Sequence, residues 1–235
     1  MEASVKAEGS KPGDYALIDQ DGVKFRLSDY FKDGKPLLVS FIYTSCPDVC
    51  PTITTAFKRA VDDARARFGA RFNVLTIGFD PAHDTRRKLK EYGSRFTSDF
   101  KSFRLATSDA ETIEKLTREF GFFYAGKDDG GFDHIDMATV VRPDGVIYKQ
   151  VYSVRTRSFN INNRLEELLT GKPYSAGPPS LLTRIRFFCY KYDPYTGRYV
   201  IDYPVILSVF LQAVVILLIV FAVWGKGIVG FFRRR

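Results

Sequence analysis

Cysteine and histidine are both scarce in this sequence of 235 residues, which contains three cysteines and two histidines. Three cysteines cannot form the set of disulfides that holds small secreted domains together, so that class of protein is excluded. The formal net charge is +8, but no basic stripe interleaved with aromatic residues is present, and no nucleic acid partner is expected. The sequence also has no internal repeat, which excludes repeat architectures.

The N-terminus has little apolar character. Residues 1–13 are polar and predict a flexible N-terminus, and the first ten residues lack the apolar core that an export signal requires. A domain exported from the cytoplasm would need such a signal. We expect the export signal either to be missing from this sequence or to have been cleaved before Met1.

Charged residues are absent from Val205 to Trp224, near the C-terminus. A helix of that length covers about 30 Å, the thickness of the apolar core of a bilayer. The sequence therefore predicts a single transmembrane helix at residues 204–225. A linker and a juxtamembrane hairpin are predicted before it, at residues 173–203, and a basic cytoplasmic tail follows it, at residues 226–235.

The basic residues after this span predict its orientation. Lys226 and Arg233–Arg235 favour the cytoplasmic side, because positive residues flanking a span are retained there. We expect the large domain on the periplasmic side of a bacterial inner membrane, or in the mitochondrial intermembrane space, with the C-terminus in the cytoplasm or matrix. The rival interpretation is a tail-anchored cytosolic protein.

Residues 14–172 predict one α/β domain with a central mixed sheet. Buried strands alternate with helices, which is typical of a parallel core, and a later strand pair around Pro143–Gly145 adds an antiparallel edge. The predicted strands after an initial hairpin are Leu37–Tyr43, Phe72–Phe79, Phe103–Thr107, Ile135–Val141 and Val146–Val151. A cysteine pair directly after the first core strand is typical of a thioredoxin-like fold.

Cys46 and Cys50 lie where the first core strand meets the following helix, and Pro51 fits the first turn of that helix. A helix N-terminus stabilises thiolates, the form that attacks disulfides and also the form that binds metals. Two thiolates suit copper(I) or zinc. Zinc usually takes four ligands or keeps a water position open, whereas copper(I) accepts three ligands. Redox exchange and metal binding both stay open at this point.

The two histidines differ in their predicted surroundings. His83 lies in a polar loop after a strand and is expected to be solvated. His134 lies between the loop Gly126–Gly131 and the next strand, and we expect that loop over the same end of the sheet as the cysteines. From spacing alone, His134 is as well explained by a structural role as by a ligand role.

Three motifs resemble those of the Sco/SenC family. They are Thr44-Ser-Cys46-Pro-Asp-Val-Cys50-Pro51, Asp80-Pro-Ala-His-Asp-Thr85, and Asp133-His134 followed by a strand and Pro143-Asp-Gly145. The resemblance covers about residues 12–170. Members of this family are copper-binding proteins of thioredoxin fold that assist assembly of the copper-A centre of cytochrome c oxidase.

The resemblance implies specific roles for four residues of this chain. Cys46, Cys50 and His134 match the copper ligands, and Asp80 matches an acidic position next to them. Copper(I) is the expected cargo, with copper(II) as the other oxidation state. The implied partner is the copper-bearing subunit of cytochrome c oxidase. The family usually has its single span at the N-terminus, whereas here it is predicted at the C-terminus.

Together these features predict a membrane-anchored copper metallochaperone rather than an enzyme. The alternative is a thiol-disulfide oxidoreductase acting on cysteines of an oxidase subunit, which needs Cys46 and Cys50 but not His134. A peroxidase is not supported, because no arginine lies near Cys46 in the sequence. The added hairpin and span suggest lasting association with a membrane respiratory complex and with the lipid bilayer. Cys189 matches none of the ligand motifs.

Overall fold

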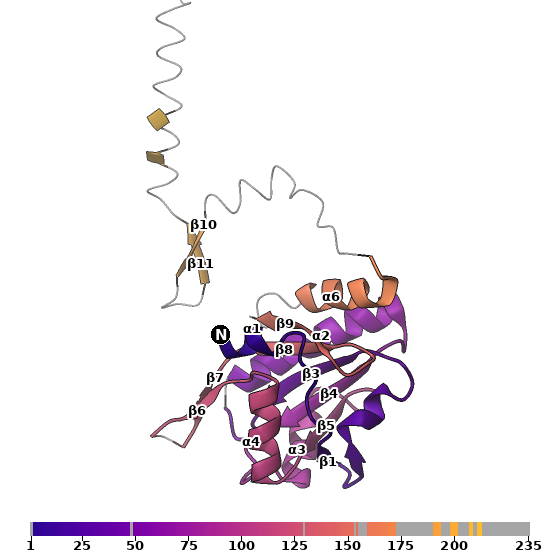
Figure 1. The fold of residues 1–235 in the computed structure, drawn as a ribbon. Coiled ribbons are helices and arrows are strands. Elements are labelled where there is room, and N and C mark those ends of the chain that lie inside the picture. Colours follow the sequence, from indigo (N-terminus) through magenta and orange to yellow (C-terminus); the bar gives the residue numbers. More distant parts are fainter. Residues whose placement is uncertain are drawn as a thin grey trace, which may run out of the picture. The chain divides into compact units, whose positions relative to one another are not determined.

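The computed structural model describes residues 2–47, 49–128, 130–152, 154, 159–172, 190–193, 198–201, 207–208 and 211–212. The chain divides into two units, Met1–Tyr174 and Ser175–Arg235. The elements of the first unit (Figure 1) are α1 (Glu2–Ala7), β1 (Ala16–Asp19), β2 (Lys24–Arg26), the 3-10 helix η1 (Leu27–Phe31), β3 (Leu37–Ile42), α2 (Val49–Phe68), β4 (Asn73–Gly78), α3 (Arg86–Gly93), β5 (Arg104–Thr107), α4 (Ala110–Glu119), β6 (Tyr124–Gly126), β7 (Phe132–His134), β8 (Met137–Val141), β9 (Ile147–Tyr152) and α6 (Phe159–Thr170).

A seven-stranded sheet forms the centre of this unit, in the order β2-β1-β5-β4-β3-β8-β9. Strands β3, β4 and β5 run parallel to one another. Strands β1, β2, β8 and β9 are joined to the sheet by antiparallel pairings. The mixed sheet with its connecting helices confirms the predicted α/β class.

Strand β3 lies inside the sheet, between β4 and β8. All six of its side chains are buried, as the largely apolar run predicts for a strand covered on both faces. Its one polar side chain, Ser40, is hydrogen-bonded to Thr76 of β4 at 2.9 Å. The strand therefore leads from a fixed position in the core straight into the loop that carries the cysteines.

Helices cover both faces of the sheet. On one face α2 and α3 are joined by a buried hydrogen bond between the Thr54 and Tyr92 hydroxyls at 2.7 Å, and α6 packs against α2. On the other face the ring of Phe120, at the end of α4, meets Phe41 of β3 with ring centroids 5.7 Å apart. Because β3 is covered from both sides, its C-terminal end has little freedom to shift.

The N-terminal residues differ from the prediction of a flexible segment. Helix α1 buries Ser4 and Ala7, and the Ser4 hydroxyl is hydrogen-bonded to the Tyr152 hydroxyl at 2.7 Å. Gly9 N–H donates to the carbonyl of Ile147 at 2.8 Å. The partners that hold this helix lie more than a hundred residues away in the chain, so a six-residue segment of small and polar side chains gives no local sign of them.

The predicted loop Gly126–Gly131 is flanked by two short strands that the sequence pattern does not reveal. Strands β6 and β7 pair antiparallel as a separate two-stranded sheet, with Tyr124 opposite His134. Each has only three residues, too few for an alternating pattern to appear. His134 therefore lies in a strand rather than in a loop.

The second unit contains an antiparallel strand pair, β10 (Tyr190–Asp193) and β11 (Arg198–Ile201), where the sequence predicts a hairpin. Of the predicted transmembrane helix at 204–225, only residues 207–208 and 211–212 are described, and the predicted tail at 226–235 lies outside the described residues. Within the described part of the chain, none of the helices combines the length and the apolar character needed to cross a membrane.

Gly121 and Gly69 provide a test of how α1 docks. Both have positive φ, +66° and +64°, but a Cβ at Gly121 would lie 2.5 Å from Cα of Ser4, while a Cβ at Gly69 would meet nothing within 4 Å. Alanine at either position costs about 1–2 kcal/mol for the left-handed backbone. We expect Gly121→Ala to lower the free energy of unfolding by about 1–3 kcal/mol more than Gly69→Ala, because α1 must also move. Urea denaturation measures the difference, and equal losses would show that α1 does not dock there.

Candidate metal centre

The cysteine loop, residues 43–47, joins the end of β3 to the start of α2. The Cys46 N–H donates to the carbonyl of Tyr43 at 3.3 Å, which closes the loop into a turn. The Cys50 N–H, in the first turn of α2, donates to the Cys46 sulfur at 3.3 Å. A backbone donor and the positive end of the helix dipole thus both favour negative charge on this sulfur.

The two cysteines are not equally accessible. Cys46 retains 6% of its accessible surface, whereas Cys50 is fully buried. Burial raises the pKa of the Cys50 thiol, and the nearby Cys46 and Asp84 raise it further. Cys46 is therefore the sulfur that a partner molecule reaches first, and Cys50 is the sulfur that stays protonated unless something replaces its proton.

His134, the last residue of β7, brings an imidazole to this pair. Its Nε2 lies 3.5 Å from the Cys50 sulfur. Its Nδ1 lies 3.2 Å from the carbonyl oxygen of Ile135. A carbonyl can only accept a hydrogen bond, so in the neutral ring Nδ1 carries the proton and Nε2 presents its lone pair to the cysteines. A backbone acceptor that fixes the ring in this way is typical of histidines that bind metals.

Aromatic rings surround His134 on the core side. The rings of Phe79, Tyr43 and Phe122 lie with centroids 5.7, 5.9 and 6.0 Å from the imidazole. Phe132 packs against both Tyr43 and Phe79, at 5.2 and 5.5 Å. These contacts restrict the imidazole to one orientation and keep water away from its inner side.

Tyr43 links the two sides of the site. Its hydroxyl accepts a hydrogen bond from the Phe132 N–H at 3.4 Å, and its ring contacts His134. Burial, together with a hydrogen bond to the Cys46 side chain, raises the pKa of Tyr43 to about 12. The phenol therefore stays neutral at physiological pH and ties the cysteine loop to β7.

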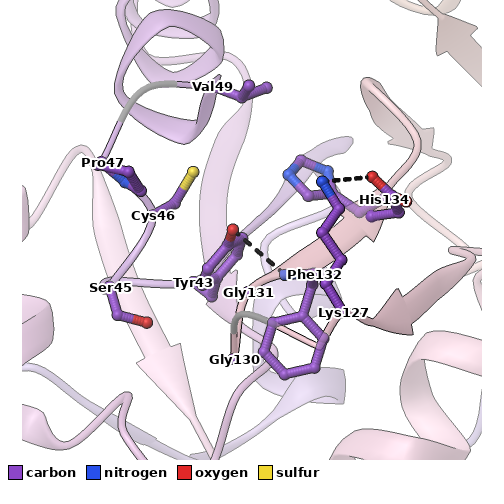
Figure 2. A pocket seen from close by; sticks show the side chains of 11 residues that line it. Tyr43, Ser45, Cys46, Pro47, Val49, Lys127, Gly130, Gly131, Phe132 and His134 are labelled. Atoms are coloured by element: carbon purple, nitrogen blue, oxygen red, sulfur yellow. Dashed lines mark hydrogen bonds and ion pairs between the residues drawn. The ribbon is translucent and has the colours of Figure 1, made fainter.

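A cleft of about 560 Å³ opens over this group of residues. Figure 2 shows the Cys46 sulfur and the His134 imidazole facing the same space from opposite walls. At the rim, Lys127 and Asp133 form an ion pair at 2.7 Å. Val49, 40% exposed, adds an apolar side chain at the edge of the cleft. A small ion or a peptide segment of a partner can therefore approach Cys46 from outside.

The predicted site residues fall into two groups. The structure brings Cys46, Cys50 and His134 together, while the Asp80 carboxylate is bonded to the Nδ1 of His83 at 2.7 Å. His83 has 68% of its side chain exposed, and Asp80 is buried beneath it. Among the described residues, no group of three or more His, Cys, Asp and Glu side chains is arranged so that it could hold a metal ion as it stands. Copper ligation by the three residues stays a prediction.

Asp84 contacts the cysteine loop directly, although the sequence pattern predicts no role for it at the site. Its carboxylate accepts a hydrogen bond from the Thr44 N–H at 2.7 Å, although the two residues are 40 positions apart. The only local sign is an aspartate directly before Thr85, the residue that caps α3. A capping segment normally leaves such a carboxylate in solvent, whereas Asp84 is fully buried.

The donor atoms of the site define its chemistry. Two cysteine sulfurs and one imidazole nitrogen form a soft donor set, which suits copper(I) better than hard ions such as magnesium or calcium. A pair of cysteines at a helix N-terminus also suits thiol-disulfide exchange. The residues present therefore fit copper, and they fit redox exchange as well.

Comparison with known proteins gives consistent matches. A family model described as SCO1/SenC matches residues 4–170. The SCO2-like protein RC0895 of Rickettsia conorii is 34% identical over 148 residues, which are 60% of this chain and 68% of that protein. Among solved structures, an Aquifex aeolicus putative electron transfer protein has TM-score 0.64 and 28% identity, covering 72% of this chain and 98% of that one. The copper-bound ScoI of Bradyrhizobium japonicum has TM-score 0.54 and 25% identity, covering 68% and 99%. These likenesses and the mixed sheet confirm the predicted thioredoxin-like fold.

The difference in burial between the cysteines predicts a difference in reactivity. In the folded, reduced protein at about pH 8, we expect iodoacetamide to alkylate Cys46 at least about tenfold faster than Cys50, because Cys50 is inaccessible and its pKa is raised. Tandem mass spectrometry assigns the label to each cysteine. In denaturing urea the two rates should converge. Equal rates in the folded protein would contradict the described arrangement.

Proposed function

Because the chain belongs to the SCO1/SenC family, we propose that it is a copper metallochaperone that supports assembly of the copper-A centre of cytochrome c oxidase. Copper is its cargo, held by Cys46, Cys50 and His134. The observation that carries this proposal is the 3.5 Å approach of His134 Nε2 to the Cys50 sulfur, although the two residues are 84 positions apart in the chain. A related protein, the ScoI of Bradyrhizobium japonicum, has a structure with copper bound.

Binding depends on replacing protons by copper. Cys50 is buried and holds its proton, so the thiolate becomes favourable only when a cation takes the place of that proton. The Ile135 carbonyl keeps the lone pair of His134 Nε2 on the side of the sulfurs. Copper affinity should therefore fall as the pH is lowered, since protons compete for both cysteines and for the imidazole. No group of three or more His, Cys, Asp and Glu side chains in the described residues is arranged to hold an ion as it stands. We therefore propose that Cys46, Cys50 and His134 close around copper as it binds.

Release proceeds by exchange of one ligand at a time. Cys46 lines the cleft, whereas Cys50 is fully buried and does not line it. A thiolate of the acceptor protein therefore meets the copper on the Cys46 side first. Cys50 and His134 hold the ion until the acceptor supplies further ligands. The proposed acceptor is the copper-bearing subunit of cytochrome c oxidase.

The role of His134 can be tested against that of the other histidine. We expect His134→Ala to weaken copper(I) binding by at least about tenfold, or about 1.4 kcal/mol, because one of three ligands is lost. His83→Ala is the matched control, since His83 is exposed and bonded to Asp80. Competition with a chromophoric copper(I) chelator measures both affinities. A smaller loss in His134→Ala, or an equal loss in His83→Ala, would refute the ligand assignment.

Thiol-disulfide exchange is the second candidate function, supported by the unequal burial of the cysteines. The Cys46 thiolate would attack a partner disulfide, form a mixed disulfide and release one partner thiolate, which takes up a proton. Cys50 would then give up its proton and attack Cys46, releasing the second partner thiol and leaving a Cys46–Cys50 disulfide. This reaction does not use His134, so unchanged exchange activity in His134→Ala would separate it from copper binding.

A membrane anchor at residues 204–225 completes the proposal. The uncharged run and the basic residues after it support a span with the C-terminus in the cytoplasm or matrix. The copper domain then lies on the periplasmic side of a bacterial inner membrane, or in the intermembrane space. An anchored domain would stay close to a membrane respiratory complex, which favours lasting association with the oxidase that it serves.

This topology predicts a specific pattern of protease sensitivity. Protease added to spheroplasts of a bacterial host should digest residues 14–172 and leave a small fragment that contains the span and the tail. Immunoblotting with tags at the two ends of the chain identifies the fragments, and detergent-lysed cells control for protease resistance. Full protection of the domain in intact spheroplasts would favour the tail-anchored alternative.

A further inference from the structure

A buried carboxylate connects two loops at one edge of the sheet. One oxygen of Asp84 accepts a hydrogen bond from the Thr44 N–H at 2.7 Å, and the other accepts from the Asp80 N–H at 2.9 Å. Thr44 belongs to the cysteine loop, and Asp80 belongs to the loop that follows β4. Asp84 has no exposed surface, so both hydrogen bonds are shielded from water.

The fold provides a close-fitting space for this side chain. Gly78, the last residue of β4, has no Cβ, and an added Cβ would lie 2.8 Å from the Asp84 carboxylate and 2.9 Å from Cβ of Asp84. The parallel strands β3 and β4 end at the same edge of the sheet, which places both loops within reach of one carboxylate. Asp84 is therefore held by packing as well as by hydrogen bonds.

The hydrogen bond to Thr44 acts at the start of the turn that carries Cys46. Thr44 lies two residues before Cys46, and the same turn is closed by the hydrogen bond from Cys46 N–H to Tyr43. Fixing the Thr44 amide fixes the direction in which the chain leaves β3. That direction decides how far the Cys46 sulfur lies from Cys50 and His134.

We propose that Asp84 is a positioning residue for the copper site, acting through the Thr44 amide on the placement of Cys46. The inference rests on the proposed copper function and assigns this role to Asp84 rather than to Asp80, whose carboxylate is bonded to His83. Asp84 does not bind the ion. It holds the cysteine loop in the position from which Cys46 completes the donor set.

Two variants distinguish the position of the Asp84 carboxylate from its presence. Asp84→Ala removes the carboxylate and leaves both backbone N–H groups, those of Thr44 and Asp80, without an acceptor. Gly78→Ala keeps the charge but forces the carboxylate out of its space. The matched control is Gly93→Ala, whose Cβ would crowd Phe100 at 2.6 Å and Leu105 at 2.8 Å, two residues of the core outside the cysteine loop.

The measurement is the copper(I) dissociation constant, from chelator competition, alongside the thermal midpoint of each variant. We expect Asp84→Ala and Gly78→Ala each to weaken binding by about tenfold, the usual effect of losing a group that orients a ligand. Gly93→Ala should lower the thermal midpoint and leave the dissociation constant unchanged. Wild-type affinity in Asp84→Ala would overturn the proposal, and so would a loss in Asp84→Ala without one in Gly78→Ala.

Hydrogen exchange of the Thr44 amide tests the same contact without copper. We expect it to exchange about tenfold faster in Asp84→Ala than in the wild type, and at the wild-type rate in Gly93→Ala. Unchanged exchange in Asp84→Ala would overturn the proposal even if Gly78→Ala failed to fold. If the wild type bound no copper(I) in a His134-dependent way, the proposed function would fail, while the exchange result would still decide whether Asp84 holds the loop.

Discussion

The burial of β3 between β4 and β8 is the constraint on which the site depends. A strand covered on both faces and paired on both edges cannot shift along its axis without breaking two ladders of hydrogen bonds. The chain must therefore leave the sheet at one fixed point. Cys46 follows that point by only a few residues, so the fixed position of the strand end also restricts the position of the Cys46 sulfur.

Two opposing effects act on the cysteines once they are placed. The N-terminus of α2 favours thiolates, whereas burial of Cys50 disfavours them and raises its pKa. A buried thiolate is no longer unfavourable once a soft cation replaces the proton, because the cation neutralises its charge inside the site. The aromatic rings around His134 strengthen the same preference, since they exclude water from one side of the donor set. The site is thus arranged to hold a charge only when an ion brings the compensating charge.

Much of the fold could be predicted because each core element has its own local signal. The apolar run at Leu37–Ile42 marks a buried strand, and the spacing of apolar residues up to Phe68 marks α2. Segments whose stability comes from distant partners gave no such signal. Helix α1 and the three-residue strands β6 and β7 were missed, because their contacts are made by residues far along the chain. The cysteine pair was evident from the sequence, but Asp84 was not, since its burial depends on the absence of a side chain at Gly78.

The sequence by itself determined the chemistry that the protein carries: two cysteines at a strand-to-helix junction, two histidines, and an uncharged run of residues near the C-terminus. Only the tertiary structure decided which histidine reaches the cysteines, because His83 is held outward by Asp80 while pairing of β7 with β6 and contacts to Tyr43 hold His134 inward. It also decided that Cys46 keeps a small accessible surface while Cys50 is fully buried. Distances between residues 84 positions apart depend on how the sheet closes, and no local pattern of side chains contains that information.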